Sequence, residues 1–173
     1  MTTRISGGQH RGRSIKTPTF GGLRPTSERV RAAVFSIIGP DAVEGKRVLD
    51  LYAGTGALGI DALSRGAAWA DFVERDGRRC KAIRGILAQL AMEGNARVHS
   101  GQVKKVLHRL EGPYDLVFAD PPYESRELIG LLDDLESLNL VAYEATIIFE
   151  YRSKAEPIEP TGRFSHITDR RYG

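Results

Sequence analysis

The sequence predicts an α/β protein with a doubly wound, mostly parallel sheet of the Rossmann-like type. Two observations support this prediction. After Lys46, short apolar runs alternate with stretches of helical periodicity, which is the pattern of a parallel sheet covered on both faces. The first run leads directly into Gly54, Gly56 and Gly59, and glycines at such a turn let the backbone approach a ligand. The 173 residues suffice for one core, so we expect one domain with a small extension.

The N-terminal extension, residues 1–40, is predicted to hold a short hairpin followed by a helix. Three glycines punctuate a loosely alternating segment over residues 4–17, which is typical of a hairpin or an extended arm. A Thr-Ser pair at 26–27 is suited to cap a helix, and a Gly-Pro pair at 39–40 ends it. The apolar positions of that helix recur at helical spacing: Val30, Ala33, Val34, Ile37 and Ile38.

Residues 41–173 are predicted to form the sheet domain. Strands are expected at residues 47–52, 70–74, 96–99, 115–120 and 145–151. Helices are expected near residues 57–65, 76–92, 102–110 and 126–136. Right-handed crossovers bring the carboxyl ends of parallel strands to one edge, where doubly wound sheets bind their ligands. The functional residues should therefore gather at that edge.

Positive charge is concentrated near the N-terminus. Residues 1–31 carry seven basic side chains against one acidic side chain, Glu28, whereas acidic residues outnumber basic ones from Val48 onward. The seven are Arg4, Arg11, Arg13, Lys16, Arg24, Arg29 and Arg31. Clustered cations suit a phosphate backbone, because each contact releases condensed counterions. A solvated basic surface is the alternative interpretation of charge alone.

Composition disfavours several other classes of protein. No apolar run approaches the ~20 residues of a membrane span, and the first nine residues lack the layout of a signal peptide. The single cysteine, Cys80, excludes an intrachain disulfide, and the four histidines show no metal-ligand spacing. We expect a cytoplasmic, monomeric protein without a resident metal.

Carboxylates at the ends of the first two strands indicate the kind of ligand. Asp50 stands four residues before Gly54, where a carboxylate favours a cationic ligand over a phosphate. Glu74 closes the second strand and is placed to accept hydrogen bonds from two ribose hydroxyls. S-Adenosylmethionine carries a sulfonium and an ammonium but no phosphate, so it fits this pattern better than a nicotinamide dinucleotide. The alternatives are a turn residue at Asp50 and a surface carboxylate at Glu74.

Other residues near these strand ends complete the candidate cofactor site. Gln102 follows the third strand, where its amide is placed for an adenine edge, with the backbone amide of Val103 as a second contact. We also assign to the cofactor site the residues around the glycine turn and after Glu74: Tyr52, Ala53, Gly54, Gly56 and Arg75.

The fourth predicted strand ends in Asp120-Pro121-Pro122-Tyr123, the candidate catalytic residues being Asp120, Pro121 and Tyr123. Two successive prolines stiffen the loop and leave the Pro121 carbonyl free to accept a hydrogen bond. Acceptors on Asp120 and Pro121 would favour a pyramidal, reactive nitrogen in a nucleobase amino group, while the tyrosine ring stacks on the base. Such a base must be unpaired or flipped out. A turn without catalytic meaning is the alternative.

The chain resembles the bacterial small-subunit ribosomal RNA guanine-N2 methyltransferases of the D type, an RsmD-like family. The resemblance spans nearly the whole chain and rests on these blocks: Arg4–Gly8 with Arg11–Arg13, Arg24–Arg31, Asp50–Gly59 with Ala62–Ala67, and Asp120–Tyr123. It implies a class I methyltransferase fold, S-adenosylmethionine as cofactor, and methylation at N2 of one guanine in 16S ribosomal RNA of the small ribosomal subunit. The basic extension is then expected to grip RNA through Arg4, Arg11, Arg13, Arg24, Thr26 and Arg29.

The chain departs from the family at two places. Members often carry Asp or Asn where this chain has Gln102, and they usually continue past the position of Gly173 into a last edge strand; either the sequence is shortened at this end or that strand is missing here. Two other functions stay open: an amino methyltransferase acting on DNA adenine or cytosine or on a protein glutamine, and a non-catalytic RNA-binding assembly protein. An NAD-dependent oxidoreductase is the weakest alternative, since nothing supplies a hydride-transfer acid or base.

Overall fold

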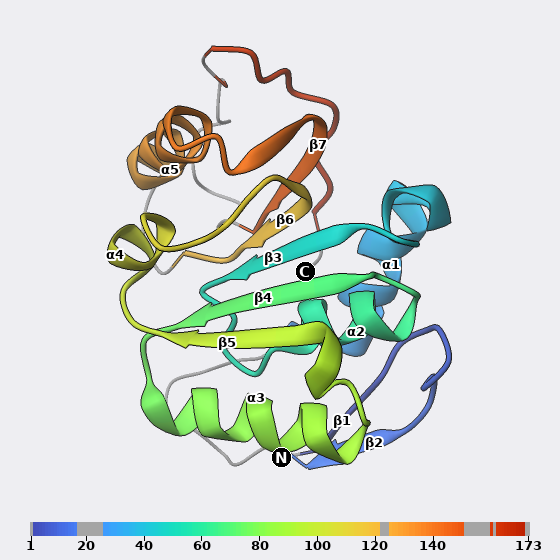
Figure 1. Ribbon diagram of the computed structural model, residues 1–173. Helices are drawn as coiled ribbons and strands as arrows, with labels where there is room; N and C mark the ends of the chain where they lie inside the picture. Colours follow the sequence, from blue (N-terminus) through green and yellow to red (C-terminus); the bar gives the residue numbers. More distant parts are fainter. Residues whose placement is uncertain (1, 17–25, 122–124, 151–159, 161, 172–173) are drawn as a thin grey trace.

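Five parallel strands form the central sheet of the protein. The computed structural model describes residues 2–16, 26–121, 125–150, 160 and 162–171 (Figure 1). The strands are β3 (Arg47–Leu51), β4 (Trp69–Glu74), β5 (Ala96–Ser100), β6 (Tyr114–Ala119) and β7 (Val141–Phe149). They lie in the order β5-β4-β3-β6-β7, with every neighbouring pair parallel. The order reverses between β3 and β6, which is the switch point where such sheets bind ligands.

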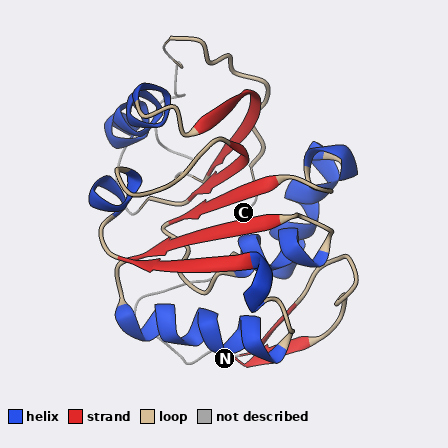
Figure 2. Ribbon diagram, viewed as in Figure 1, coloured by secondary structure: helices blue, strands red, loops and turns tan. Residues whose placement is uncertain are grey.

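Helices cover both faces of this sheet (Figure 2). One face packs against α1 (Glu28–Ile38), α2 (Ala57–Ser64) and α3 (Gly77–Gln89), which contribute Phe35, Ile60 and Ile83 to one buried cluster. The other face packs against α4 (Val103–Leu107) and α5 (Ser125–Ser137), which contribute Val106 and Leu131 to a second cluster. Two short 3-10 helices, η1 (Pro40–Ala42) and η2 (Glu93–Asn95), lead into β3 and β5. The doubly wound Rossmann-like fold is confirmed.

Most predicted elements are confirmed within a few residues, and β7 differs most. It begins at Val141, four residues before the predicted start, and its pairing with β6 shifts in register between Tyr114 and Leu116. Its first half exposes polar positions and Tyr143 is 89% exposed, so the sequence there lacks the apolar pattern of a buried strand. Within the part of the chain that the structure describes, no strand pairs with the outer edge of β7.

The predicted N-terminal hairpin is present as β1 (Thr2–Arg4) paired antiparallel with β2 (Ser14–Lys16). Ile5 and Ile15 are buried in the same cluster as the sheet, so the hairpin packs on the body of the protein. Ser27 caps α1, its hydroxyl accepting from the Val30 amide at 3.3 Å.

A buried ion pair attaches the hairpin to α1 and α2. The guanidinium of Arg31 lies 2.8 Å from the carboxylate of Asp61, and both side chains are 1% exposed. Asp61 also accepts from the amide and hydroxyl of Ser6, at 2.9 and 2.6 Å. Arg31 donates in turn to the carbonyl oxygens of Arg4 and Thr26. Arg31, which counts toward the N-terminal charge in the sequence, is therefore a structural residue and not part of the basic surface.

The tip of the hairpin is held against the end of α2. The Ser64 hydroxyl donates to the carbonyl of Gly7 at 2.7 Å, and the Gln9 amide donates to the carbonyl of Ser64 at 2.7 Å. Gly8 has a φ of 75°, and a Cβ there would lie 1.8 Å from the Ser64 carbonyl oxygen, so only glycine fits. Because α2 runs from the carboxyl edge of the sheet back to the amino edge, the tip lies where the strands begin (Figure 1).

A polar cluster lies on the sheet near the start of its strands. The carboxylate of Asp71 accepts from Trp69 Nε1 and from the Tyr114 hydroxyl, both at 2.7 Å, and it lies 2.7 Å from His99 Nε2. Burial raises the pKa of Asp71, but these hydrogen bonds outweigh burial and hold the pKa below its usual value. The cluster ties β4, β5 and β6 together.

Two searches of the described residues found nothing. None of their helices is both long and apolar enough to cross a membrane. None of their His, Cys, Asp and Glu side chains form a group of three that is suited to hold a metal ion.

Candidate active site

A pocket opens at the carboxyl edge of the sheet, between the ends of β3 and β6. It brings together residues far apart in the sequence: Thr26, Asp50, Tyr52, Gly54, Thr55 and Asp120. Thr26 precedes α1, Asp50 lies in β3, the glycine turn follows β3, and Asp120 follows β6. Four of the predicted cofactor residues, Asp50, Tyr52, Ala53 and Gly54, thus share one pocket with the predicted catalytic residue Asp120, and a residue of the N-terminal extension lines it as well.

Asp50 is a buried carboxyl group beneath the glycine turn. It is 3% exposed, lies within β3, and accepts a hydrogen bond from the Gly59 amide at 2.9 Å. Burial, to which the charges of Asp120 and Glu74 add, raises the pKa of Asp50 to about 8 against the opposing effect of the Gly59 hydrogen bond. The alternative of a turn residue at a strand end is wrong, since this is a strand residue whose carboxyl group faces the pocket.

The glycine turn has the close packing that its sequence predicts. The φ angles of Tyr52, Gly54 and Gly56 are 56°, 57° and 72°, so the backbone turns sharply as it leaves β3. A Cβ at Gly59 would lie 2.3 Å from a ring atom of Phe72 and 3.0 Å from the Asp50 carboxylate. Gly59 therefore allows α2 to pack on β4 while its amide holds Asp50.

Glu74, at the end of β4, holds two loops with one carboxylate. It is 4% exposed, one oxygen accepts from the Gly54 amide at 2.8 Å, and the other accepts from the Asp76 amide at 2.8 Å. The alternative of a surface carboxylate is therefore wrong. Each oxygen keeps further acceptor capacity, and the contact of Glu74 with two ribose hydroxyls stays a prediction. Arg75 is exposed beside it.

Gln102 and Val103 follow β5 at the same edge. Gln102 is the exposed N-cap residue of α4, yet its side chain makes no capping hydrogen bond. Val103 is buried and belongs to the cluster beneath α4. Their contact with an adenine ring stays a prediction.

Asp120 stands at the end of β6, followed by the buried Pro121. Partial withdrawal from water and, after it, the negative charge of Glu150 raise the pKa of Asp120 to about 6. Pro122 and Tyr123 lie outside the residues that the structure describes, so the stacking role of Tyr123 stays a prediction.

Glu150 is the acidic residue at this edge that the sequence prediction missed. It follows β7, and its amide donates to the Ala119 carbonyl at 2.9 Å, which places it beside Asp120. The hydroxyl of Thr26 donates to its carboxylate at 3.1 Å. The signal was available, because Glu150 directly follows the apolar residues 147–149 near the end of its predicted strand, much as Glu74 and Asp120 end theirs.

The predicted RNA-contacting residues do not form one surface. Thr26 lines the pocket and the exposed Arg29 lies in the first turn of α1, near it. Arg11 and Arg13 are exposed on the hairpin tip at the opposite edge of the sheet, where Arg13 lines a groove with the ends of α2 and α3. Arg4 is exposed at the end of β1, and Arg24 lies outside the described residues.

These residues fit S-adenosylmethionine by the charges they present. The carboxyl groups of Asp50, Glu74, Asp120 and Glu150 gather at one edge, and such a set repels phosphate and attracts a cation. The glycine turn leaves room for close approach, and Glu74 offers acceptors for a ribose. The arrangement is suited to hold a cationic nucleoside beside an acceptor for hydrogen bonds from an amine.

Comparisons with known proteins indicate the family of the chain. The family model described as "Conserved hypothetical protein 95" matches residues 3–173. The chain is 41% identical over 147 residues to the ribosomal RNA small subunit methyltransferase D of Escherichia coli (strain K12), which covers 85% of the chain and 73% of that protein. It is 32% identical over 173 residues to the protein YlbH of Bacillus subtilis (strain 168), covering 98% and 94% of the two chains.

Solved structures share the fold. The Escherichia coli protein yhhF matches with a TM-score of 0.76 and 37% identity, over 85% of this chain and 79% of that chain. The Podospora anserina methyltransferase PaMTH1, solved with bound S-adenosylhomocysteine, matches with a TM-score of 0.62 and 17% identity over 72% and 53% of the two chains, which shows the fold alone. With a family model that matches almost from end to end, a relative at 41% identity, and Asp50 and Asp120 in one pocket, the chain belongs to the RsmD-like methyltransferase family.

Proposed function

We propose that this protein transfers the methyl group of S-adenosylmethionine to the exocyclic N2 of a guanine in 16S ribosomal RNA of the small ribosomal subunit. The observation that supports the proposal best is the shared pocket: Asp50 and the glycine turn lie beside Asp120 at the switch point of the sheet. The relative from Escherichia coli that is named a ribosomal RNA small subunit methyltransferase supports the substrate class.

The residues divide the work between binding and orientation. Bound S-adenosylmethionine would supply an electrophilic methyl group on its sulfonium. Asp50 and Glu74 bind and orient the cationic nucleoside, and the Asp120 carboxylate and Pro121 carbonyl accept hydrogen bonds from the two N–H groups of the guanine amine. The accepted hydrogen bonds hold the amine lone pair toward the methyl group. After transfer the amine nitrogen loses a proton, and the solvent-exposed Asp120 is placed to pass it to water.

The basic hairpin is proposed to bind a part of the RNA distant from the target base. Arg11 and Arg13 are exposed at the amino edge of the sheet, whereas Asp120 lies at the carboxyl edge. Replacing both arginines with Ala should weaken RNA binding most at low salt, because fewer counterions are released. Binding that is unchanged at every salt concentration would contradict this role.

One assay tests cofactor, acceptor atom and substrate class together. The purified protein is incubated with methyl-labelled S-adenosylmethionine and, separately, small ribosomal subunits, free 16S RNA, duplex DNA or ribosomal protein, and the modified product is identified. The proposal expects N2-methylguanosine with subunits or 16S RNA and nothing with the other two. Label in DNA or protein would favour a different amino methyltransferase, and binding of RNA without transfer would favour a non-catalytic assembly protein.

Asp120→Ala separates catalysis from cofactor binding in the same assay. The variant should lose turnover and keep its affinity for S-adenosylmethionine, which calorimetry measures, because Asp120 faces the acceptor side of the pocket. Loss of both would show that Asp120 belongs to the cofactor site.

A further inference from the structure

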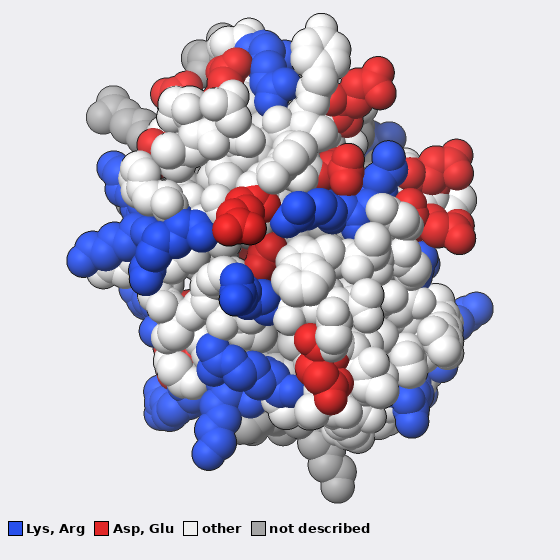
Figure 3. Space-filling model, in the orientation of Figure 1, with Lys and Arg blue, Asp and Glu red and all other residues white. Residues whose placement is uncertain are grey.

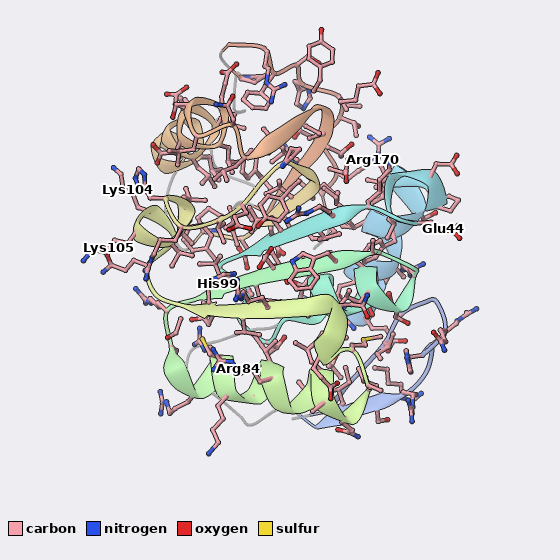
Figure 4. All side chains as sticks on the ribbon, in the orientation of Figure 1. Glu44, Arg84, His99, Lys104, Lys105 and Arg170 are labelled. Atoms are coloured by element: carbon pink, nitrogen blue, oxygen red, sulfur yellow. The ribbon has the colours of Figure 1, made fainter. Side chains whose placement is uncertain are left out.

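Six exposed cations surround the edge strand β5, outside the predicted basic extension. They come from three elements and the turn after α4: Lys81, Arg84, Arg97, Lys104, Lys105 and Arg109. We call these six the β5 basic surface. Figure 3 shows Lys and Arg gathered over α3 and α4 at the side of the molecule where the strands end. In Figure 4, Lys104 and Lys105 project outward from α4 and Arg84 lies between α3 and β5.

The local charge is as one-sided here as in the N-terminal extension. Residues 77–110 carry eight basic side chains and one acidic side chain, Glu93. Glu93 lies in η2, before β5 begins, and so at the other end of that strand from α4. None of the six cations of the β5 basic surface forms an ion pair within the described parts of the chain. No ion pair within those parts of the chain therefore compensates their charge.

The position of the β5 basic surface relative to the pocket suggests its use. Lys104 and Lys105 follow Gln102 and Val103, so they lie at the carboxyl edge of the sheet, as does Asp120. The hairpin tip lies at the amino edge, and a strand of six residues such as β4 is about 20 Å long at ~3.3 Å per residue. The nucleotides that flank the target base are therefore too far from the hairpin tip for it to hold them.

The electrostatics of the pocket give such a surface a use. Asp50 and Asp120 line the pocket, and Glu74 and Glu150 lie close to them; in their ionised forms these carboxyl groups favour a cation in the pocket and repel the phosphates on either side of a nucleotide that enters it. Cations at the same edge of the sheet attract those phosphates and offset the repulsion. We propose that the β5 basic surface binds the phosphate backbone of the RNA whose base enters the active site. This inference rests on the proposed RNA substrate.

Protection of the sheet edge explains only part of this surface. Charged side chains at an edge strand block its pairing with other chains. Arg84 contributes to this, because its guanidinium donates a hydrogen bond to the carbonyl of Val98 in β5 at 2.7 Å. Arg97 also stands on the edge strand itself. Lys104 and Lys105 lie on α4, away from the ladder, so edge protection does not account for them.

The test compares two variants that each lose two adjacent exposed cations. Lys104→Ala with Lys105→Ala removes part of the β5 basic surface, and Arg170→Ala with Arg171→Ala is the matched control, since Figure 4 places Arg170 far from α4. Binding to 16S RNA is measured by fluorescence anisotropy across a salt series. Two lost contacts should make the slope of log affinity against log salt shallower by roughly 1.5, and weaken binding roughly ten- to thirtyfold at about 0.1 M salt.

The outcomes separate this inference from the proposed function. Equal salt slopes for the two double variants, with the wild type still methylating RNA, would overturn the inference alone. Failure of the wild type to bind or methylate any RNA would overturn both. The double variant Lys104→Arg with Lys105→Arg keeps both charges and should bind RNA as the wild type does. The double Ala variant should keep its affinity for S-adenosylmethionine, and this result would exclude damage to the neighbouring cofactor site.

Discussion

Replacing Arg31 with Met should cost the protein about 3–5 kcal/mol of its free energy of unfolding. The Arg31 and Asp61 side chains are 1% exposed and 2.8 Å apart, so the variant leaves a buried carboxylate without its cation. Among the described residues, the amide and hydroxyl of Ser6 are the donors that Asp61 keeps. Two backbone carbonyls, of Arg4 and Thr26, lose their donor as well, and leaving a buried acceptor unsatisfied costs about 1–3 kcal/mol.

Urea unfolding followed by circular dichroism measures the effect. Arg29→Met is the matched control, because Arg29 is exposed on the same helix and its replacement should change stability by less than about 0.5 kcal/mol. Arg31→Met combined with Asp61→Leu removes the unpaired charge and should recover part of the loss. If the free energy of unfolding of Arg31→Met lies within about 1 kcal/mol of that of Arg29→Met, the ion pair does not hold the hairpin, and the reasoning is refuted.

Three further predictions concern the pocket. Because the pKa of Asp120 is raised to about 6, kcat/KM should fall up to tenfold per pH unit below about pH 6. Glu150→Gln removes a negative charge and should shift this fall in kcat/KM to lower pH. An unshifted pH profile would show that the charge of Glu150 does not affect the pKa of Asp120. The pKa of Asp50 is raised to about 8, and a bound cation favours its ionised form. Calorimetry should therefore show that the affinity for S-adenosylmethionine rises with pH up to about 8. In Asp50→Asn this affinity should depend less on pH. Gly59→Ala places a Cβ 2.3 Å from an aromatic ring of β4 and should lower stability by about 1–3 kcal/mol in thermal unfolding, while Gly77→Ala, with open space around it, should not.

The sheet was predictable because local patterns decide it. Each strand of the interior is an apolar run, and the turn after β3 carries its glycines at the positions where φ is positive or a helix packs closely. Asp50, Glu74 and Asp120 were found for the same reason, since each ends or nearly ends such a run and parallel topology brings those ends together. The start of β7 was missed because its first residues are exposed.

Features that depend on long-range contact were not predictable. Arg31 and Asp61 are thirty residues apart, and nothing local distinguishes Arg31 from the exposed Arg29 in the same helix. The β5 basic surface was hidden for a different reason. Acidic residues outnumber basic ones over the whole stretch from Val48, which masks the one-sided charge of residues 77–110, and the fold then places the cations of α3, β5 and α4 on one side.

The anchoring of the hairpin also bears on how the protein could select its RNA. The Arg31–Asp61 pair joins the hairpin, α1 and α2, and Arg31 also holds the Thr26 carbonyl at the edge of the pocket. The hairpin tip and the acceptor pocket are therefore held at a fixed distance from each other. An RNA that touches both must present its target base at a fixed distance from a second phosphate-rich site. A folded RNA meets that condition in one register, whereas a short oligonucleotide reaches either the hairpin tip or the pocket, but not both at once.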